Sequence, residues 1–525
     1  MTAGPANAPP AAAGRSIAWI RAHTPELLSA LAGVAHTLSF APFGLPALQP
    51  AALAVLIALV QRQPSWPRAA RLGFAFGLGW FATGVSWVYI SMHVYGDMPA
   101  WIAALATLAF AAVLAIFPAL AAAAAYRAAA SPALRLLLAW PGAWALTEWL
   151  RGKLLSGFPW IAGGYAHTDG PLAGFAPLAG VYGLCLLGAL MAGAVVLLLQ
   201  RRSAPTRFAA LAVALVLIAG GTLLRRVEWT QAAGAPLQVK LIQGNIAQNL
   251  KFADGGTQLA VQRYFPLMFD AAGEHSDLVV LPESAFPLPL NDLPREVRQG
   301  LLDFPSGQHA ALIFGTFLLE PDDRIYNSAV GLQADAPMQS YRKRHLVPFG
   351  EFIPFGFRWF VDLMKIPIGD QDRGTRFQPP MQLAGQSIAV NICFEDLFGA
   401  EIIAAWHDPA SQPTLLLNLS NLAWFNDSIA LPQHLQISRM RALETRLPLL
   451  RATNTGATAI IDSHGKVQAQ LPFLQTAALR AEVSGFRGRT PYVRLGDWPA
   501  LALALAMVAV SLVAGRIPPA RTRET

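Results

Sequence analysis

The residues best suited to chemistry are a cysteine, a lysine and a glutamate that lie far apart in the chain. Cys393, one of two cysteines in 525 residues, ends the apolar segment 387–393. A thiol at the end of a buried strand is well placed to act as a nucleophile, but free cysteine is just as often a small core residue. Glu283 ends a second apolar segment, 277–283, and Lys343 lies among basic residues.

These three side chains together supply the groups needed for acyl transfer through sulfur. A free thiol has a pKa of about 8.5, so at neutral pH it is mostly protonated and needs a base. Glu283 can accept the proton, and the Lys343 ammonium can stabilise the thiolate and then the oxyanion of a tetrahedral intermediate. The backbone N–H of Phe394 is a natural second donor to that oxyanion.

Each charged residue also fits an ordinary structural role. Glu283 fits a solvated loop acid, and Lys343, with its basic neighbours, fits a wet surface. Glu351 fits a cap for the segment that follows it. Glu395 fits an acid in the first turn of a helix, where the helix dipole favours it. Taken singly, none of these residues decides between the two interpretations.

The elements that must position these residues alternate between strands and helices. Apolar or alternating segments predict strands at 237–243, 277–281, 310–316, 387–393 and 414–418. Residues 256–271 and 432–446 have helical spacing. Strands that are apolar throughout are buried on both faces, so residues 236–490 are predicted to form an α/β sandwich. Reactive groups gather at strand ends in such sheets, which is where Glu283 and Cys393 lie.

The apolar residues outside this region predict a membrane protein. The chain as a whole is 54% hydrophobic and 13% charged, whereas soluble domains are about 25% charged. A bilayer core requires about 20 apolar residues per helix. We therefore predict spans at 25–42, 46–62, 72–92, 98–126, 133–150, 175–200, 207–224 and 497–515. Residues 25–226 would then form a membrane domain of about seven spans, and 497–515 a final transmembrane helix.

Arginines between the predicted spans indicate the orientation. Those on one side are Arg15, Arg21, Arg62, Arg68, Arg71, Arg127, Arg135, Arg201, Arg202, Arg207, Arg516, Arg521 and Arg523. The positive-inside rule makes this side cytoplasmic, with the tails 1–24 and 516–525, and places the α/β region outside the cytoplasm. The net charge of +8 follows from this topology and needs no nucleic acid partner. A membrane boundary then separates Cys185 from Cys393, so Cys393 is predicted to stay a free thiol.

The order Glu, Lys, Cys, with its flanking residues, resembles the nitrilase, or carbon–nitrogen hydrolase, superfamily. The resemblance rests on segments 281–284, 343–351 and 391–395. Outside the cytoplasm, between seven spans and one, such a domain resembles the bacterial apolipoprotein N-acyltransferase family. Further segments that agree with this family lie at 157–160, 243–246, 418–421, 424–425, 433–436 and 439–442.

This resemblance implies a role for each matched residue. Glu283 is the implied general base, Lys343 the oxyanion stabiliser and Cys393 the nucleophile. Glu351 is the implied second acid, which orients the lysine or an incoming amine, and Glu395 supports the site. The implied fold of this domain is an α-β-β-α nitrilase-like sandwich.

The resemblance also implies substrates and a location. The family moves an acyl chain from a phospholipid to the cysteine, as a thioester, and then to the α-amine of a lipoprotein's diacylglyceryl-cysteine, in a ping-pong reaction. The implied location is the bacterial inner membrane, with the catalytic domain on the periplasmic side. No cofactor is expected, because the chain has no metal spacing such as Cys-x2-Cys and no phosphate-binding glycine loop.

Three positions depart from the family's pattern. Phe394 stands where tyrosine is common, Phe252 where tryptophan is common, and Leu422 where a loop acid is common. A hydroxyl, an indole N–H and a carboxylate are therefore missing at these positions. None of the three changes touches the Glu, Lys and Cys.

An aromatic segment, 352–364, is predicted to be a lid that dips into the membrane interface and lines an acyl entrance. A packed helix between strands is the alternative. The candidate substrate contacts are Phe252, Phe352, Phe357, Trp359, Trp160 and Trp424. Trp160 equally fits an interfacial anchor. His434 suggests a Cys–His pair, but nitrilase-like sites use a glutamate, so a structural role is predicted for it.

Two other functions stay open on the residues alone. One is a membrane-tethered amidase of the nitrilase type, with water as the acceptor, which would turn over small amides without lipid. The other is a transporter or scaffold that only binds its partner. The scarcity of acids within the predicted spans argues against transport.

Overall fold

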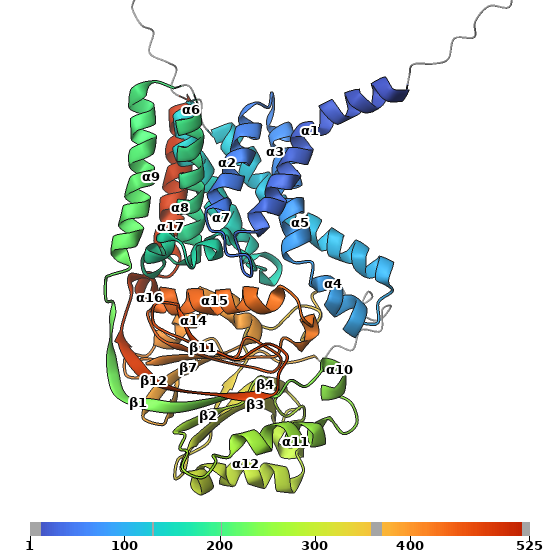
Figure 1. Cartoon of the computed structure of the whole chain (residues 1–525), viewed down its shortest axis with the longest axis vertical. Helices are drawn as coiled ribbons and strands as arrows, with labels where there is room; N and C mark the ends of the chain where they lie inside the picture. The colour runs from blue at the N-terminus through green and yellow to red at the C-terminus, as the bar shows by residue number, and fades with distance from the viewer. Residues whose placement is uncertain (1–11, 129–130, 201, 357, 359–369, 517–525) are drawn as a thin grey trace, which may run out of the picture.

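The computed structural model describes residues 12–128, 131–200, 202–356, 358 and 370–516. Figure 1 shows two parts stacked end to end, a bundle of long helices and an α/β domain below it. Phe357 and Trp359, two of the predicted lid residues, lie outside the described residues.

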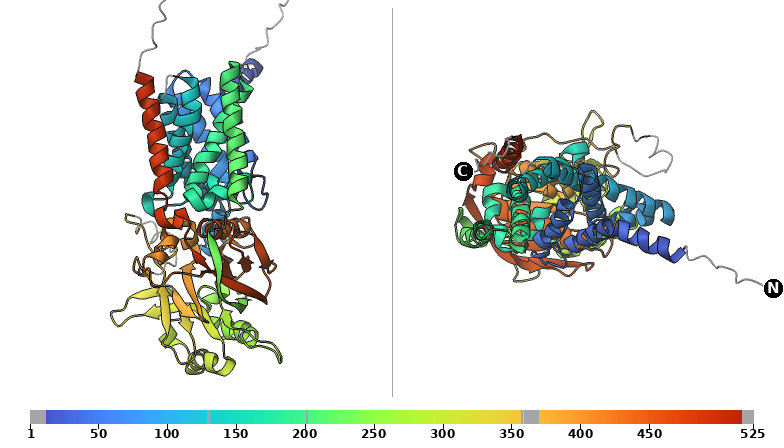
Figure 2. Two further views of the ribbon diagram at one scale, coloured as in Figure 1. Left: turned by 90° about the vertical axis from the view of Figure 1, so that its left-hand side faces the viewer. Right: turned by 90° about the horizontal axis from the view of Figure 1, so that it is seen from above.

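Apolar helices lie side by side in the bundle, with α9 and α17 on its flanks in the left view of Figure 2. The long helices are α1 (Ala12–Thr37), α2 (Leu48–Gln61), α3 (Trp66–Gly84), α5 (Ala100–Ala128), α7 (Trp140–Arg151), α8 (Ala176–Leu199), α9 (Ala204–Leu224) and α17 (Trp498–Arg516). Four segments among the described residues are long and apolar enough to cross a membrane, at 100–128, 171–199, 204–224 and 498–515. Helices α1, α2 and α7 are shorter or less apolar, so the number of spans stays a prediction.

The predicted span at 72–92 is a bent pair of helices rather than one straight helix. Helix α3 ends at Gly84, and the segment 88–95, which begins with α4 (Val88–Ile90), continues at an angle of 59°. A Cβ on Gly84 would lie 2.3 Å from Cδ1 of Ile161, in the loop after α7. Trp87, in the break, donates from Nε1 to Gln433 Oε1 of the α/β domain at 3.2 Å. The break therefore lies where the bundle contacts the α/β domain, a feature that hydropathy does not reveal.

The α/β domain contains two six-stranded sheets, in the orders β12-β1-β2-β3-β4-β5 and β11-β10-β9-β8-β7-β6. Their strands are β1 (Thr230–Gln243), β2 (Leu278–Val280), β3 (Ala311–Leu319), β4 (Ile325–Leu332), β5 (Gln339–Arg342), β6 (Met381–Leu383), β7 (Gln386–Ile392), β8 (Leu415–Ser420), β9 (Leu449–Thr453), β10 (Ala459–Ile461), β11 (Val467–Gln470) and β12 (Ala477–Gly488). The central pairings are parallel in both sheets, β1 to β3 and β7 to β9. The five predicted strands match β1, β2, β3, β7 and β8.

The two sheets pack face to face, and helices cover their outer faces (Figure 1). These helices are α11 (Gly256–Met268), α12 (Arg295–Gln308) and α15 (Ala430–Thr445). Apolar side chains from both sheets, such as Leu241, Ile313 and Leu417, share one buried core. Helix α15 lies between its sheet and the bundle. The predicted helical bundle with an α-β-β-α sandwich is therefore confirmed.

Candidate active site

The three predicted catalytic side chains lie around one cavity at the ends of strands from both sheets. Glu283 follows β2, Lys343 follows β5, and Cys393 follows β7, and all three line a cavity of about 2230 Å³. Lys343 Nζ donates to Glu283 Oε1 at 3.0 Å and to Glu351 Oε1 at 2.7 Å. Packing of the two sheets therefore brings together groups that are far apart in the chain.

Glu283 is held as a carboxylate. Its Oε1 also accepts from Asn327 Nδ2 at 2.8 Å, and its Oε2 accepts from the backbone N–H of Asn421 at 2.8 Å. Burial opposes ionisation, but the charge of Lys343 and the hydrogen bond from Asn327 outweigh it and hold the pKa of Glu283 below its usual value. An ionised carboxylate in a cavity wall can accept a proton.

Lys343 is only 1% exposed, so its charge has to be balanced by its neighbours. Burial alone would lower the pKa of Lys343, but Glu283 and Glu351 outweigh burial and raise it. Lys343 therefore stays an ammonium, and the wet-surface interpretation of this residue is wrong. A fixed ammonium beside the cysteine can stabilise negative charge that develops during a reaction.

Cys393 begins a 3-10 turn, η7 (Cys393–Leu397), instead of ending the strand as predicted. Its φ of 52° lies in the left-handed region, which costs a non-glycine residue about 1–3 kcal/mol. Burial first, and the charge of Glu283 second, raise the pKa of Cys393 to about 12, against the opposing charge of Lys343. The resting sulfur is therefore a thiol, and it would need a base to act as a nucleophile.

The two supporting acids hold the loops of the site together. Glu351 joins Lys343 to the backbone, because its Oε2 accepts from the N–H of Val347 at 2.8 Å. Glu395 accepts backbone N–H groups of Ile392 at 2.7 Å, Arg344 at 2.7 Å and His345 at 3.1 Å. It thereby ties the Lys343 loop to the turn of Cys393. Glu395 also lies in the first turn of η7. Its position therefore fits both the predicted supporting role in the site and the role of an acid in the first turn of a helix.

The aromatic candidates within the described residues line the same cavity. They are Phe252, Phe352, Phe394, Trp160 and Trp424. Phe252 is 54% exposed, while Trp160 is only 3% exposed and donates from Nε1 to Gln433 Oε1 at 2.8 Å. Trp160 is thus packed between the two parts of the molecule rather than free in a membrane interface.

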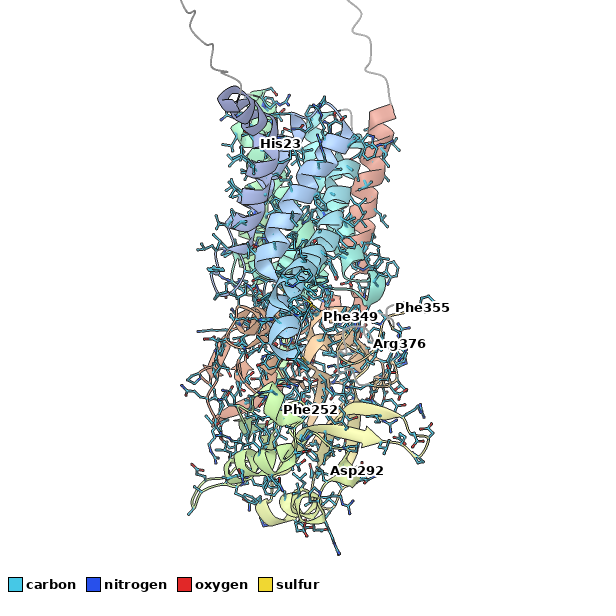
Figure 3. The ribbon with its side chains drawn as sticks, turned by 90° about the vertical axis from the view of Figure 1, so that its right-hand side faces the viewer. His23, Phe252, Asp292, Phe349, Phe355 and Arg376 are labelled. Atoms are coloured by element: carbon cyan, nitrogen blue, oxygen red, sulfur yellow. The ribbon has the colours of Figure 1, made fainter. Side chains whose placement is uncertain are left out.

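The cavity extends from Glu283, Lys343 and Cys393 along one side of α5. Its lining there includes Ala106, Phe110, Val113, Phe117 and Leu120. This spacing of three or four residues places the side chains on one face of the helix. Figure 3 shows Phe349 and Phe355 near the boundary between the bundle and the α/β domain, and Phe252 below it. The cavity therefore has a polar end at Glu283, Lys343 and Cys393 and an apolar wall among the helices.

Three polar residues of the site had no functional role in the sequence prediction. Asn327, on β4, donates to both Glu283 and Glu351, at 2.8 and 3.1 Å. Lys251 is buried, donates from Nζ to the backbone oxygen of Glu283 at 3.0 Å, and burial lowers the pKa of Lys251 to about 8. Asn421 lies in segment 418–421, one of the segments that carry the family resemblance, and Lys251 directly precedes Phe252, which was compared with the family pattern. The sequence therefore pointed to the neighbourhood of these two residues, but it gave no signal for Asn327.

His434 contacts the backbone of the cysteine and not its sulfur. Its Nε2 lies 3.2 Å from the backbone oxygen of Cys393. A Cys–His catalytic pair is therefore not formed. Among the described residues, no group of three or more His, Cys, Asp or Glu side chains is arranged to hold a metal ion.

Comparisons with known proteins agree with this arrangement. The family model for the apolipoprotein N-acyltransferase N-terminal domain matches residues 32–194, and the model for carbon–nitrogen hydrolase matches residues 213–489. An apolipoprotein N-acyltransferase of Ralstonia nicotianae is 47% identical over 493 residues, covering 93% of each chain. That of Bordetella bronchiseptica is 42% identical, covering 96% of this chain and 99% of its own.

A solved structure is similar to part of the chain. It is a CN-hydrolase superfamily protein of Xanthomonas campestris, 18% identical with a TM-score of 0.36, which covers 48% of this chain and 91% of its own. The Ralstonia and Bordetella relatives match both parts of the molecule, at 47% and 42% identity. The chain belongs to the apolipoprotein N-acyltransferase family, and its α/β domain is a carbon–nitrogen hydrolase domain.

Proposed function

We propose that this acyltransferase moves a fatty acyl chain from a phospholipid to the α-amine of a lipoprotein's N-terminal diacylglyceryl-cysteine, through a thioester on Cys393. The single observation that carries the proposal is the shared cavity. It is lined at one end by Glu283, Lys343 and Cys393 and at the other by the apolar face of α5. Such a cavity suits a substrate with an ester group and a long apolar chain.

In the first half-reaction, Cys393 attacks the ester carbonyl of the phospholipid. Glu283 takes the thiol proton as the sulfur–carbon bond forms, because the thiol is too weakly acidic to ionise beforehand. Lys343 and the N–H of Phe394 stabilise the oxyanion. The carbon–oxygen bond then breaks, Glu283 returns the proton to the leaving alkoxide, and a lysophospholipid departs.

In the second half-reaction, the α-amine of the lipoprotein attacks the thioester. Glu283 accepts a proton from the amine as the carbon–nitrogen bond forms, and the carbon–sulfur bond breaks. The proton passes to the departing sulfur, which regenerates the thiol. An apolar wall that excludes water favours the amine over hydrolysis. Glu351 keeps Lys343 in place during both steps, and no cofactor takes part.

We further propose that the protein is a multi-pass protein of the bacterial inner membrane. Residues 25–226 and 497–515 form its membrane part, and 236–490 is the catalytic domain on the periplasmic side. The arginine pattern between the spans supports this orientation. Both substrates are lipids that reach a site at the membrane surface from the bilayer.

The test of the reaction is the mass of the intact protein purified from membranes. We expect an added acyl group that hydroxylamine removes and that peptide mapping assigns to Cys393. The variant Cys393→Ala should lack it. If small amides are turned over without lipid and no acyl adduct forms with phospholipid vesicles, the protein is an amidase that uses water, and the proposal fails.

A further inference from the structure

A buried polar network lies behind the nucleophile and takes no part in the proposed proton transfers. His434, Arg451 and Asn418 are all 0% exposed. Arg451 Nη2 lies 2.7 Å from His434 Nδ1, and its Nη1 donates to Asn418 Oδ1 at 2.8 Å. Asp396 balances the guanidinium charge at 3.5 Å. This many buried polar groups on one side of a nucleophile require a reason.

The network determines which nitrogen of His434 carries the proton. An arginine guanidinium has donors only, so His434 Nδ1 must accept from Arg451. In a neutral ring the proton is then on Nε2, and Nε2–H donates to the backbone oxygen of Cys393 at 3.2 Å. Burial first, and the charge of Arg451 second, lower the pKa of His434 well below its usual value, so the ring stays neutral.

That hydrogen bond acts on the peptide that follows the nucleophile. The oxygen of Cys393 and the N–H of Phe394 belong to one planar peptide unit, in which they point in opposite directions. Fixing the oxygen therefore fixes the direction of the Phe394 N–H, the second oxyanion donor in the proposed reaction. The left-handed φ of Cys393, 52°, has to be held by such contacts, because it is unfavourable by itself.

The helical bundle holds the other side of this histidine. The ring of Trp160 stacks on the ring of His434, with centroids 5.3 Å apart and planes at 15°. Trp160 is fixed in turn, because its Nε1 donates to Gln433 Oε1 at 2.8 Å. The loop after α7 thus fixes the ring face, while Arg451 fixes the ring nitrogens.

We propose that His434 is a positioning residue that anchors the Cys393–Phe394 peptide and so directs the Phe394 N–H at the oxyanion, with Trp160 of the bundle holding its ring. This inference rests on the proposed acyl transfer. It gives the membrane part a role in the geometry of catalysis in addition to binding lipid.

The test compares His434→Leu with His434→Gln in the full-length protein. Glutamine retains an acceptor for Arg451 and a donor for the Cys393 oxygen, whereas leucine has neither. With phospholipid vesicles and a synthetic diacylglyceryl-cysteine peptide, we expect kcat of His434→Leu to fall about 10²–10³-fold, as for loss of one oxyanion donor. KM should change little, and His434→Gln should recover most of the lost kcat.

Alkylation of Cys393 by iodoacetamide distinguishes this role from general damage, because that reaction forms no oxyanion. We expect His434→Leu to be alkylated at close to the wild-type rate. Trp160→Leu should also lower kcat, by a smaller factor, while its alkylation rate stays close to that of the wild type. His464→Leu, on the exposed hairpin of β10 and β11, is the control and should match the wild type in both measurements.

Two results would overturn the inference. One is a normal kcat in His434→Leu, and the other is a parallel loss of alkylation and acyl transfer with no rescue by glutamine. Failure of the proposed function is a separate outcome, since wild-type protein would then form no acyl adduct on Cys393.

Discussion

At the scale of single residues, the proposed chemistry depends on the relation between the Cys393 thiol and Glu283, its proposed base. Glu283 is ionised, Lys343 is an ammonium, and Cys393, with a pKa raised to about 12, is a thiol at neutral pH. One buried site thus holds a neutral thiol, an ionised carboxylate and a positively charged ammonium. In the proposed acyl transfer, the sulfur becomes a nucleophile as its proton moves to Glu283.

Replacement of Glu283 by glutamine should separate the ionisation of the sulfur from catalysis. The negative charge of Glu283 raises the pKa of Cys393, so Glu283→Gln lowers that pKa. We expect iodoacetamide to alkylate Cys393 faster at pH 8, whereas acyl transfer falls about 10²–10⁴-fold for want of a base. Glu296→Gln, on the surface of α12, is the matched control. Slower alkylation in Glu283→Gln would contradict an ionised Glu283 beside a neutral thiol.

The pH dependence of the wild-type thiol follows from the same pKa. Below a pKa of about 12, the thiolate fraction rises about tenfold per pH unit. We therefore expect the alkylation rate of Cys393 to climb without a plateau from pH 7 to about pH 10, as measured by mass spectrometry of the modified peptide. A plateau near neutral pH would indicate a preformed thiolate and refute the general-base step.

Lys343 and Glu351 should differ sharply in their effect on stability. Lys343 contacts two carboxylates, at 3.0 and 2.7 Å, so Lys343→Met leaves two buried negative charges without the cation that bridges them. Loss of one partner from a buried ion pair costs about 3–5 kcal/mol. Glu351→Gln leaves the Lys343–Glu283 pair intact. We expect a large fall in the thermal unfolding midpoint for the first variant and a small one for the second.

Low pH provides the check on this charge effect. Acidification protonates the two carboxylates of Lys343→Met and removes their repulsion, so its deficit relative to wild type should shrink as the pH falls toward about 4. A deficit that is the same at pH 5 and pH 8 would mean that lost packing, and not charge, is the cause.

At the scale of elements, the ends of strands determine where the proposed catalytic groups lie. Glu283 follows β2, and the next strand, β3, packs against the turn that carries it. A Cβ on Gly315 of β3 would lie 2.5 Å from the Pro282 oxygen and 2.7 Å from Glu283 Cα. The absence of a side chain at this one position allows Glu283, the proposed base, to sit in the cavity wall.

Gly315→Ala should therefore displace the base. The atoms it would strike are backbone atoms, which cannot rotate away, so we expect the chain at Glu283 to shift and activity to fall at least tenfold (an order-of-magnitude expectation for a misplaced catalytic group). Gly307→Ala is the matched control, because its Cβ would meet nothing within 4 Å. In a helix that change should be neutral or stabilise by up to about 1 kcal/mol. Equal activities of the two variants would contradict this role of Gly315.

At the scale of the whole molecule, the site lies where the two parts meet. The cavity takes its polar wall from the α/β domain and its apolar wall from α5 and the segment after α3. In Figure 3, His23 lies in the end of the bundle away from the α/β domain, and Asp292 lies toward the opposite end of the molecule. A membrane around the bundle would therefore separate these two ends.

Labelling of single cysteines in spheroplasts should reveal this orientation. In a Cys393→Ala background, the remaining Cys185 is buried. We expect a membrane-impermeant maleimide to label Asp292→Cys directly but to label Ser203→Cys, in the α8–α9 loop, only after permeabilisation. The reverse pattern would place the catalytic domain in the cytoplasm.

Much of this protein follows from its sequence alone, because the signals are local. Apolar runs and polarity alternation identified the helices of the bundle and five strands of the two sheets. Glu283, Lys343 and Cys393 were predicted as the catalytic residues from their residue types, their flanking segments and a resemblance to a family. These features depend on neighbours within a few positions, which a sequence displays directly.

Only the tertiary structure decided what surrounds those residues. The contacts of Asn327, Lys251 and His434, the bend after Gly84 and the apolar cavity wall on α5 all join segments far apart in the chain. Such contacts depend on how two sheets and a helical bundle pack, and no local periodicity encodes that packing. The protonation states of Glu283, Lys343 and Cys393 also depend on the tertiary structure, because burial and neighbouring charge exist only once the chain is folded.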